Sequence, residues 1–488
     1  MTDIETPRSV NSAGTAHPSG RWWILVTVGL AQLMVVLDAT IVNIALPSAQ
    51  TELGFSNTDR QWVITAYSLA FGSLLLLGGR LSDLIGRKRA FIIGLIGFAG
   101  SSAVAGGAGS FGLLVAARAF QGGFGALLAP AGLALLTTTF VAPEERRRAL
   151  GIWAGIAGAG GAVGLLLGGA LTQSFGWRWN LYVNVFFAIM ALVGAVLLVR
   201  NQPRSSARPR LDVLGTILVA GGMFGLVYGF SNSATSGWSS PLTWGFLVGG
   251  SMLITLFGLW QRRVASPLLP LSIILNRTRG AAFISLLIAG ASMLGLFLFL
   301  TYYLQVQRSY TPLQSGLAFL PLIAALVVSS AVTSNRMAPR FGPKVVIPIG
   351  MLVAAGGMVY LTQISLTTGY ASGVMPALIL MGLGIGATFA TGVGAITHDI
   401  DPRYAGVASS LVSTSQQMGG SIGTAILNSL AATAATTYLA GHLPGRVQAL
   451  AQLDGYSTAF WWAAGFLAAG AVLTAFLYTR TDRAHRRD

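Results

Sequence analysis

The sequence predicts an all-α polytopic membrane protein, and three observations support this fold class. Fourteen apolar stretches are long enough to cross a bilayer, because a helix rises ~1.5 Å per residue and the hydrocarbon core is ~30 Å thick. Charged residues make up only 9% of the chain, against about 25% in soluble domains. Glycine accounts for 63 of the 488 residues, and such small residues let membrane helices pack closely.

The fourteen predicted spans follow one another with short connections. They are residues 22–46, 60–79, 90–108, 111–136, 149–172, 181–199, 212–231, 243–261, 280–304, 314–333, 345–364, 374–397, 405–430 and 457–479. The first span is too long for a signal-peptide core, so we expect it to remain as a helix after the polar tail 1–21. A second polar tail, residues 480–488, ends the chain.

The basic residues predict the orientation of the spans. A net charge of +16 could indicate a nucleic-acid-binding protein, in which the charge gathers on one face. Here 25 of the 30 Lys and Arg residues fall on every second loop and on the two tails. This alternation follows the positive-inside rule. We therefore expect both termini in the cytoplasm, a location in the inner or plasma membrane, and no nucleic-acid partner.

Several kinds of chemistry have no residues to support them. The chain has no Cys and only four scattered His residues, so we expect no metal site and no thiol chemistry. Neither of its two Lys residues is followed by Ser or Thr, which excludes a phosphate-binding Walker loop. A membrane enzyme would need clustered acids or histidines. We expect no enzymatic activity and no cofactor, and an ion gradient as the energy source unless a separate chain supplies ATP.

Two sets of residues recur at a nearly constant distance along the chain, which indicates an internal duplication. Arg80, Gly86 and Lys88 match Arg336, Gly342 and Lys344 at an offset of 256, and Arg148, Gly151, Gly164 and Gly168 match Arg403, Gly406, Gly419 and Gly423 at an offset of 255. The layout is then a six-helix bundle (22–199), a linker with two inserted helices (200–279) and a second six-helix bundle (280–479). Parallel six-helix repeats are a transporter architecture with the substrate site between the halves.

Four motifs carry a resemblance to a known family. They are Leu-Asp-Ala-Thr-Ile-Val-Asn-Ile-Ala-Leu-Pro at 37–47, Gly-Arg-Leu-Ser-Asp-Leu-Ile-Gly-Arg-Lys-Arg at 79–89, Arg-Ala-Phe-Gln-Gly at 118–122, and the stretch 303–321. With these motifs, the chain resembles the fourteen-helix drug:proton antiporter family of the major facilitator superfamily. The resemblance implies a major facilitator fold with 6+2+6 transmembrane helices. It also implies a monomer that exports amphipathic drugs, toxins or secondary metabolites by alternating access, in exchange for protons.

Asp38 and Arg118 are the two charged side chains that lie well inside the predicted spans. A charge costs ~2.5–3.5 kcal/mol or more at such a depth and usually faces a cavity, a partner or an ion path. At ~1.5 Å per residue, Asp38 lies ~24 Å and Arg118 ~20 Å from the inner boundary. The two residues are therefore expected at a similar depth in the outer half of the membrane.

A carboxyl group in this setting can exchange a proton when its access changes, because burial favours the protonated form and a nearby arginine favours the ionised form. The resemblance implies that Asp38 is the proton acceptor and that Arg118 tunes it. The alternative is a permanent ion pair that only holds the first span against the fourth.

Further polar and aromatic residues are candidates for contact with the substrate. Gln121 lies one turn from Arg118 on the same face of the fourth span. The other candidates lie on spans that line the central cavity in the superfamily that the chain resembles: Asn43, Tyr67, Tyr303, Gln305, Gln416 and Gln417. Ordinary hydrogen bonding between helices is an equal alternative for each of them.

The loop after the second span is a candidate gate. Asp83 would lie at the cytoplasmic end of that span, near the start of the thirteenth span at Arg403. A helix N-terminus favours a nearby carboxylate, and the resemblance implies that this contact latches the cytoplasmic side shut. Further gate residues are Arg80, Gly86, Arg87 and Lys88. For Arg87 and Lys88, a role as topology charges is at least as well supported.

The fifth span carries a stripe of glycines that includes Gly161, Gly164 and Gly168, with Gly169 beside it. We expect a close, pliable contact between the halves here, although some of these positions are expected to serve static packing only. The antiporter motif that the chain resembles has a proline after its glycine, where this chain has Leu165. This difference leaves proton-coupled uptake of a small metabolite as the alternative function.

Overall fold

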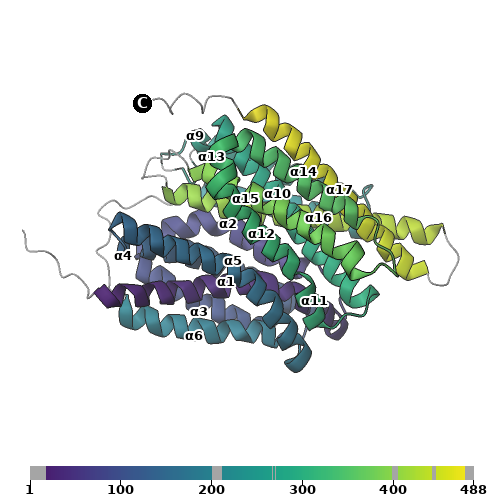
Figure 1. The fold of residues 1–488 in the computed structure, drawn as a ribbon, viewed down its shortest axis with the longest axis horizontal. Coiled ribbons are helices and arrows are strands. Elements are labelled where there is room, and N and C mark those ends of the chain that lie inside the picture. The colour runs from purple at the N-terminus through teal and green to yellow at the C-terminus, as the bar shows by residue number, and fades with distance from the viewer. Residues whose placement is uncertain are drawn as a thin grey trace, which may run out of the picture.

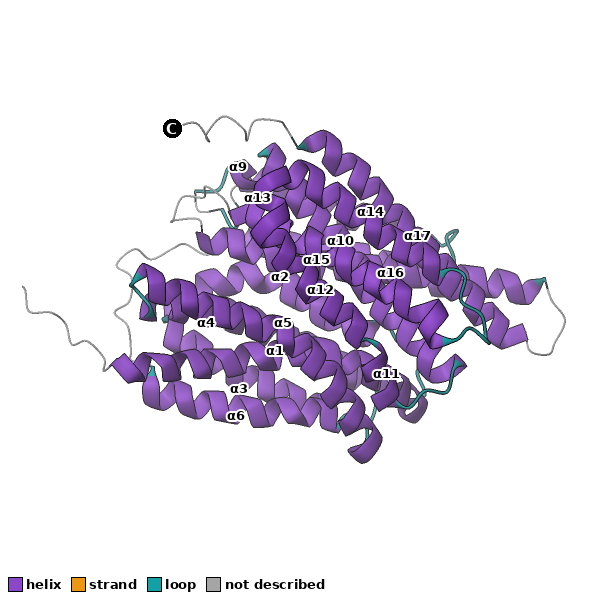
Figure 2. Cartoon of the chain, in the orientation of Figure 1, coloured by secondary structure: helices purple, strands orange, loops and turns teal. Residues whose placement is uncertain are grey.

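The computed structural model describes residues 18–199, 212–265, 267–269, 271–397, 405–441 and 447–478, and every regular element in these ranges is a helix (Figure 2). The predicted C-terminal tail 480–488, residues 1–17 of the N-terminal tail and the polar linker 200–211 lie outside them. The N-terminal end of the first helix and the C-terminal end of the last helix lie at the same end of the molecule (Figure 1).

The first bundle contains six long helices. They are α1 (Pro18–Leu53), α2 (Trp62–Ile85), α3 (Arg87–Gly106), α4 (Phe111–Thr139), α5 (Pro143–Phe175) and α6 (Trp179–Leu198). The turn from α2 to α3 consists of Gly86 alone, whose φ of 95° disfavours residues with a side chain. The side chain of Ser110 accepts a hydrogen bond from the backbone N–H of Leu113 and caps α4.

The inserted pair consists of α7 (Val213–Ser236) and α8 (Pro241–Gln261), followed by the short α9 (Leu271–Ile274). The second bundle contains α10 (Arg277–Tyr302), η1 (Tyr303–Gln307), α11 (Pro312–Ala318), α12 (Leu320–Val332), η2 (Thr333–Met337), α13 (Ala338–Phe341), α14 (Pro343–Leu361), η3 (Tyr370–Val374), α15 (Met375–Thr397), α16 (Ala405–Ala440) and α17 (Val447–Leu477). The elements named η are π-helices.

Within the described residues, twelve helical segments are long and apolar enough to cross a membrane. The chain is therefore a multi-pass membrane protein, as the sequence predicts. The long helices α5 and α16, of 33 and 36 residues, are not among the twelve, and each contains side chains that the structure does not describe. The count of fourteen spans stays a prediction.

One predicted span is built differently from the expectation. Residues 314–333 are not one helix, because α11 ends at Ala318 and α12 begins at Leu320. Pro321 lies in the first turn of α12, where its missing N–H costs nothing, whereas inside a helix it would break a hydrogen bond.

The two bundles lie side by side (Figure 1), and α7 of the inserted pair contacts both α2 of the first bundle and α16 of the second. On the first bundle, the side-chain amide of Gln61 donates to the hydroxyl of Ser231 in α7 over 2.8 Å. On the second bundle, the hydroxyls of Ser233 in α7 and Ser429 in α16 share a hydrogen bond. The inserted helix α7 therefore bridges the halves beside the contact between α2 and α16.

The halves meet at the end of the molecule opposite to the basic loops, which we call the outer end. There the side-chain amide of Gln305 donates to the carbonyl of Ile44 over 3.0 Å, and Gly169 of α5 touches the backbone of Leu313. Toward the inner end of α5, no described atom of a neighbouring helix lies within 4 Å of where a Cβ of Gly151 or Gly155 would stand. Among the described residues, α5 therefore touches the second bundle at the outer end and not at these two inner positions.

Candidate functional site

The two deep charges meet in the middle of the first bundle. Arg118 of α4 donates from Nη1 to Oδ2 of Asp38 of α1 over 2.6 Å. Asp38 has no exposed surface and Arg118 is 1% exposed. A buried charge is costly unless it is paired and hydrogen-bonded, so the pair explains how both side chains are tolerated at this depth.

Asp38 accepts two further side-chain hydrogen bonds, both on Oδ1. The donors are Nε2 of Gln121 at 2.8 Å and Nδ2 of Asn184 at 2.7 Å. The hydroxyl of Ser102 lies between these two amides, since it accepts from Gln121 at 3.1 Å and from Asn184 at 3.0 Å. Four helices, α1, α3, α4 and α6, thus converge on one carboxylate.

Arg118 has partners other than Asp38. Its Nε donates to the carbonyl of Val63 over 3.1 Å, and its Nη1 donates also to Oε1 of Gln121 over 2.6 Å. The guanidinium carbon lies 4.5 Å from the ring centroid of Tyr67, within the range of a cation–π contact. Apart from Asp38, Arg118 therefore has three partners: the carbonyl of Val63, the amide oxygen of Gln121 and the ring of Tyr67. These contacts would remain if the charge of Asp38 were removed.

Two members of this network, Ser102 and Asn184, are not among the residues predicted from the sequence. A serine in an apolar helix carries no distinctive pattern. Asn184 had a detectable signal, because Asn180 and Asn184 stand one turn apart in the otherwise apolar α6, and polar side chains inside membrane helices usually bind a partner. Both asparagines are completely buried.

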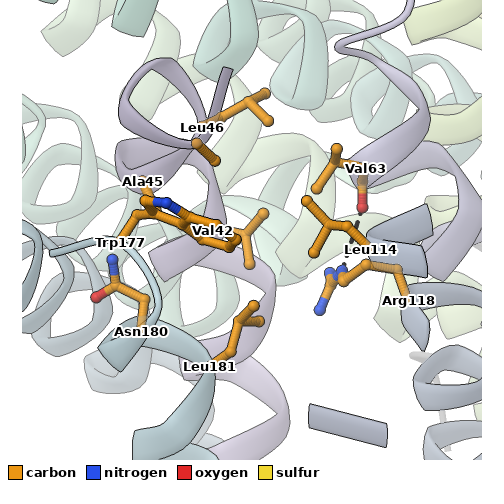
Figure 3. A pocket seen from close by; sticks show the side chains of 10 residues that line it. Val42, Ala45, Leu46, Val63, Leu114, Arg118, Trp177, Asn180 and Leu181 are labelled. Atoms are coloured by element: carbon orange, nitrogen blue, oxygen red, sulfur yellow. Dashed lines mark hydrogen bonds between the residues drawn. The ribbon is translucent and has the colours of Figure 1, made fainter. Parts of the chain in front are cut away.

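A small cavity lies beside Arg118, on the outer side of the pair (Figure 3). Its volume is about 10 Å³, which is room for about one water molecule. Apolar side chains such as Val42 and Leu114 form most of its wall, and Trp177 and Asn180 stand at one edge. The cavity therefore leaves a small, mostly apolar space beside the guanidinium.

The predicted substrate contacts fall into two groups. Gln121 and Tyr67 belong to the Asp38 site, and the buried hydroxyl of Tyr67 has no partner among the described residues. The amide of Asn43 donates to Ala39 of its own helix at 2.9 Å. The four candidates of the second bundle lie away from Asp38. The structure thus joins only Gln121 and Tyr67 to the pair.

Those four candidates have distinct positions. Tyr303 is 1% exposed, and its hydroxyl donates to the carbonyl of Ser365 at 2.7 Å within the second bundle. Gln305 connects the halves through Ile44, as described above. Gln416 and Gln417 are half-buried on α16, and the Cβ of Gln417 faces Gly72 of α2 across the seam. Gln305 and Gln417 therefore lie where the halves touch.

The predicted gate residues lie at the inner end of α2 and α3. The Asp83 side chain is 46% exposed, and its Oδ1 lies 3.7 Å from Nε of Arg87. Arg80 donates to the carbonyl of Pro267 over 3.2 Å, and Lys88 to that of Val196 over 3.1 Å. The expected partner of Asp83, the start of the thirteenth span near Arg403, lies outside the described residues.

The glycines of α5 point in two directions. A Cβ on Gly168 would lie 2.6 Å from the side chain of Ile41, and one on Gly164 would overlap Thr40, so both face α1 of the same bundle. Gly161 and Gly169 face Ile323 of α12 and Leu313 of α11 in the other bundle. Only part of the stripe therefore lies at the contact between the halves.

Comparison with known proteins agrees with this architecture. The sequence model for the Major Facilitator Superfamily matches residues 28–424. The chain is 45% identical over 480 residues to a puromycin resistance protein of Streptomyces alboniger, covering 97% of this chain and 95% of that protein. It is 35% identical over 428 residues to a tetracenomycin C resistance and export protein of Streptomyces glaucescens, covering 86% and 79%.

Solved structures support the fold. A crystal structure of the POT family transporter PepTSo matches with a TM-score of 0.68 at 13% sequence identity, covering 95% of this chain and 98% of that one. A bacterial homologue of the human lysosomal transporter Spinster, in an inward-facing and unoccupied conformation, matches with a TM-score of 0.65 at 15% identity, over the same shares of the two chains.

Proposed function

Because the chain belongs to the major facilitator superfamily, we propose that it is a proton-coupled exporter of small amphipathic compounds. The relatives described above are named for resistance to puromycin and for resistance to and export of tetracenomycin C. Drugs, toxins or secondary metabolites of this kind are the proposed cargo. The transport cycle would be alternating access.

The Asp38 site carries the proposal of proton coupling. Among the described residues, Asp38 is the only acid with no exposed surface. An ionisable residue at such a depth is a functional candidate by default. Its carboxylate accepts hydrogen bonds from Arg118, Gln121 and Asn184.

The network suggests how one proton could change the conformational preference of the protein. A proton on Asp38 removes the charge that holds Arg118, and Arg118 is then held by Gln121, Val63 and the ring of Tyr67. The direct electrostatic tie between α1 and α4 weakens as a result. Because α1 also contacts α10 and α11 of the second bundle, a shift of α1 would be felt at the interface between the halves.

Transport by the purified protein in liposomes tests this function. With puromycin as the first compound, an acidic vesicle interior should drive accumulation by antiport, and a protonophore should abolish it. Adding or omitting ATP should have no effect. A symporter would instead need an acidic exterior. Accumulation without a gradient that depends on ATP, or that requires sodium, would refute proton coupling.

A further inference from the structure

A second buried arginine lies far from the Asp38 site, at the outer end of the molecule. Arg60 is in the turn between α1 and α2 and is only 4% exposed. Within the described part of the chain, no carboxylate forms an ion pair with it, and its buried Nε has no hydrogen-bond partner. A buried charge without a carboxylate needs another source of stabilisation.

Aromatic rings of the second bundle supply that stabilisation. The guanidinium carbon of Arg60 lies 3.9 Å from the ring centroid of Tyr302, 5.8 Å from that of Phe299 and 5.9 Å from that of Tyr456. All three distances are within the ~6 Å range of cation–π attraction. The rings come from α10 and α17, and we call them the aromatic box.

Two of the three rings are also held by packing within the second bundle. The rings of Phe299 and Tyr456 pack on each other with centroids 5.9 Å apart, and Phe299 also packs on Phe460 at 6.3 Å. All of these side chains are at least 97% buried. The second bundle therefore supplies the rings of a cation site, and the first bundle supplies the cation that fills it.

This division between the bundles has a consequence for transport. When the outer ends of the two bundles separate, Arg60 moves with α1 and α2 while the rings stay with α10 and α17. The box then loses its cation and faces the opening. Three aromatic rings around a vacant position are the arrangement that recognises ammonium-type cations.

We propose that the vacated aromatic box is an outer binding site for amphipathic monocations, such as protonated amines or quaternary ammonium and phosphonium compounds. Arg60 is then an internal substitute that fills the box when the outer end is closed. A cationic substrate and Arg60 compete for the same rings, so departure of the substrate and closure of the outer end favour each other. The inference rests on the proposed export function and names a substrate class for it.

Equilibrium binding of tetraphenylphosphonium to the purified full-length protein, without any gradient, tests this site. Arg60→Gln removes the competing cation and is expected to tighten binding about tenfold, which is the order that a desolvated cation–π contact supplies. In the Arg60→Gln background, Tyr302→Leu with Tyr456→Leu should abolish the gain. Tyr302→Phe should keep it, because phenylalanine retains the ring.

Arg178→Gln is the matched control. Arg178 is also near the outer end and lies 4.6 Å from the ring of Trp177, but it pairs with Glu52 inside the first bundle. This variant should bind the probe as the wild type does. Cysteine labelling at the outer end of α2, in the otherwise Cys-free chain, reports opening separately.

Two results would overturn the proposal. The first is unchanged probe binding in Arg60→Gln. The second is a gain that survives loss of both tyrosines, which would make Arg60 a latch only. Neither result tests proton coupling, because the binding is measured without a proton gradient. Conversely, loss of gradient-driven puromycin transport in the wild type would defeat the proposed function while the binding result stands on its own.

Discussion

The sequence predicts that the two bundles are copies of one repeat, but their centres are very different. At the offset of 256, Asp38, Arg118 and Gln121 of the first bundle correspond to Leu294, Val374 and Ala377 of the second. The first three form a hydrogen-bonded ion pair. The second three are apolar, and Val374 and Ala377 are almost completely buried.

The difference suggests that the two bundles have different roles. The first bundle has a charged centre, which we propose to be the proton site, whereas the matching positions of the second bundle carry no ionisable side chain. At the outer end the second bundle supplies aromatic rings, and the first supplies the cation that they hold. The halves are therefore complementary at the outer end.

The loops after the second helix of each bundle show the same contrast on a smaller scale. Gly86 and Gly342 both have positive φ, 95° and 74°, so both turns need glycine for the same reason. The acid is different, because Asp83 in the first loop corresponds to Pro339 in the second. Both loops keep the glycine turn, and only the first has an acidic residue at this position.

The largest expected effect comes from the charged centre. Asp38→Asn keeps the size of the side chain but cannot exchange a proton, so gradient-driven transport should fall to the level of protein-free liposomes at normal membrane abundance. Asp38→Glu should retain part of the activity. The measurement is pH-dependent transport by folded, reconstituted protein.

Leu294→Asn, at the matching position of the second bundle, is the control and should leave proton coupling intact. If the pair were only structural, Asp38→Asn would mainly reduce expression, because Arg118 would be buried without a counter-charge. Wild-type coupling in a folded Asp38→Asn protein would move the proton site elsewhere.

A smaller effect is expected where α5 meets the second bundle. A Cβ on Gly169 would lie 2.6 Å from Cα of Leu313 and 2.7 Å from the carbonyl oxygen of Pro312, and backbone atoms cannot move aside cheaply. Gly169→Ala should therefore disfavour closure of the outer end by about 1–3 kcal/mol, the usual cost of overpacking. Cysteine labelling from outside should become faster.

Gly155→Ala is the matched variant on the same helix, because no atom lies within 4 Å of its added Cβ. It should label as the parent protein does. Equal labelling of the two variants would mean that α5 does not limit closure of the outer end.

The smallest effect is expected at the inner loop. If Asp83 binds the start of the thirteenth span when the inner end closes, Asp83→Asn should favour the inward-open state. The expected shift is ~0.3–1 kcal/mol, as for a carboxylate at a helix N-terminus, or up to about fivefold in population. Faster labelling of cysteines at the inner ends of α2 and α16 would show it.

Pro339→Ala, in the corresponding loop, should not change the labelling. If Asp83→Asn leaves both labelling and transport unchanged, Asp83 serves only the loop itself, where it already lies near Arg87.

Local pattern was enough for the class and the family. Apolar runs of membrane length, the alternation of basic loops and the motifs around Asp38, Asp83 and Arg118 predicted a helical membrane protein of the major facilitator superfamily, and both are confirmed. The similar depth of Asp38 and Arg118 was also predictable, because rise per residue converts position in a helix into depth. These features depend only on neighbours along the chain.

Only the tertiary structure could decide which residues share a site. Asn184 reaches Asp38, and Ser102 reaches Asn184, because α3 and α6 present these side chains to the interior of the bundle, and no spacing within one helix encodes that orientation. For the same reason the glycines of α5 divide between two partners. Arg60 is buried among rings about 240–400 positions away along the chain because burial is set by packing between helices. Because hydrophobicity is a local property, the sequence alone predicts which segments enter the membrane. Packing between the helices sets which side chains meet there.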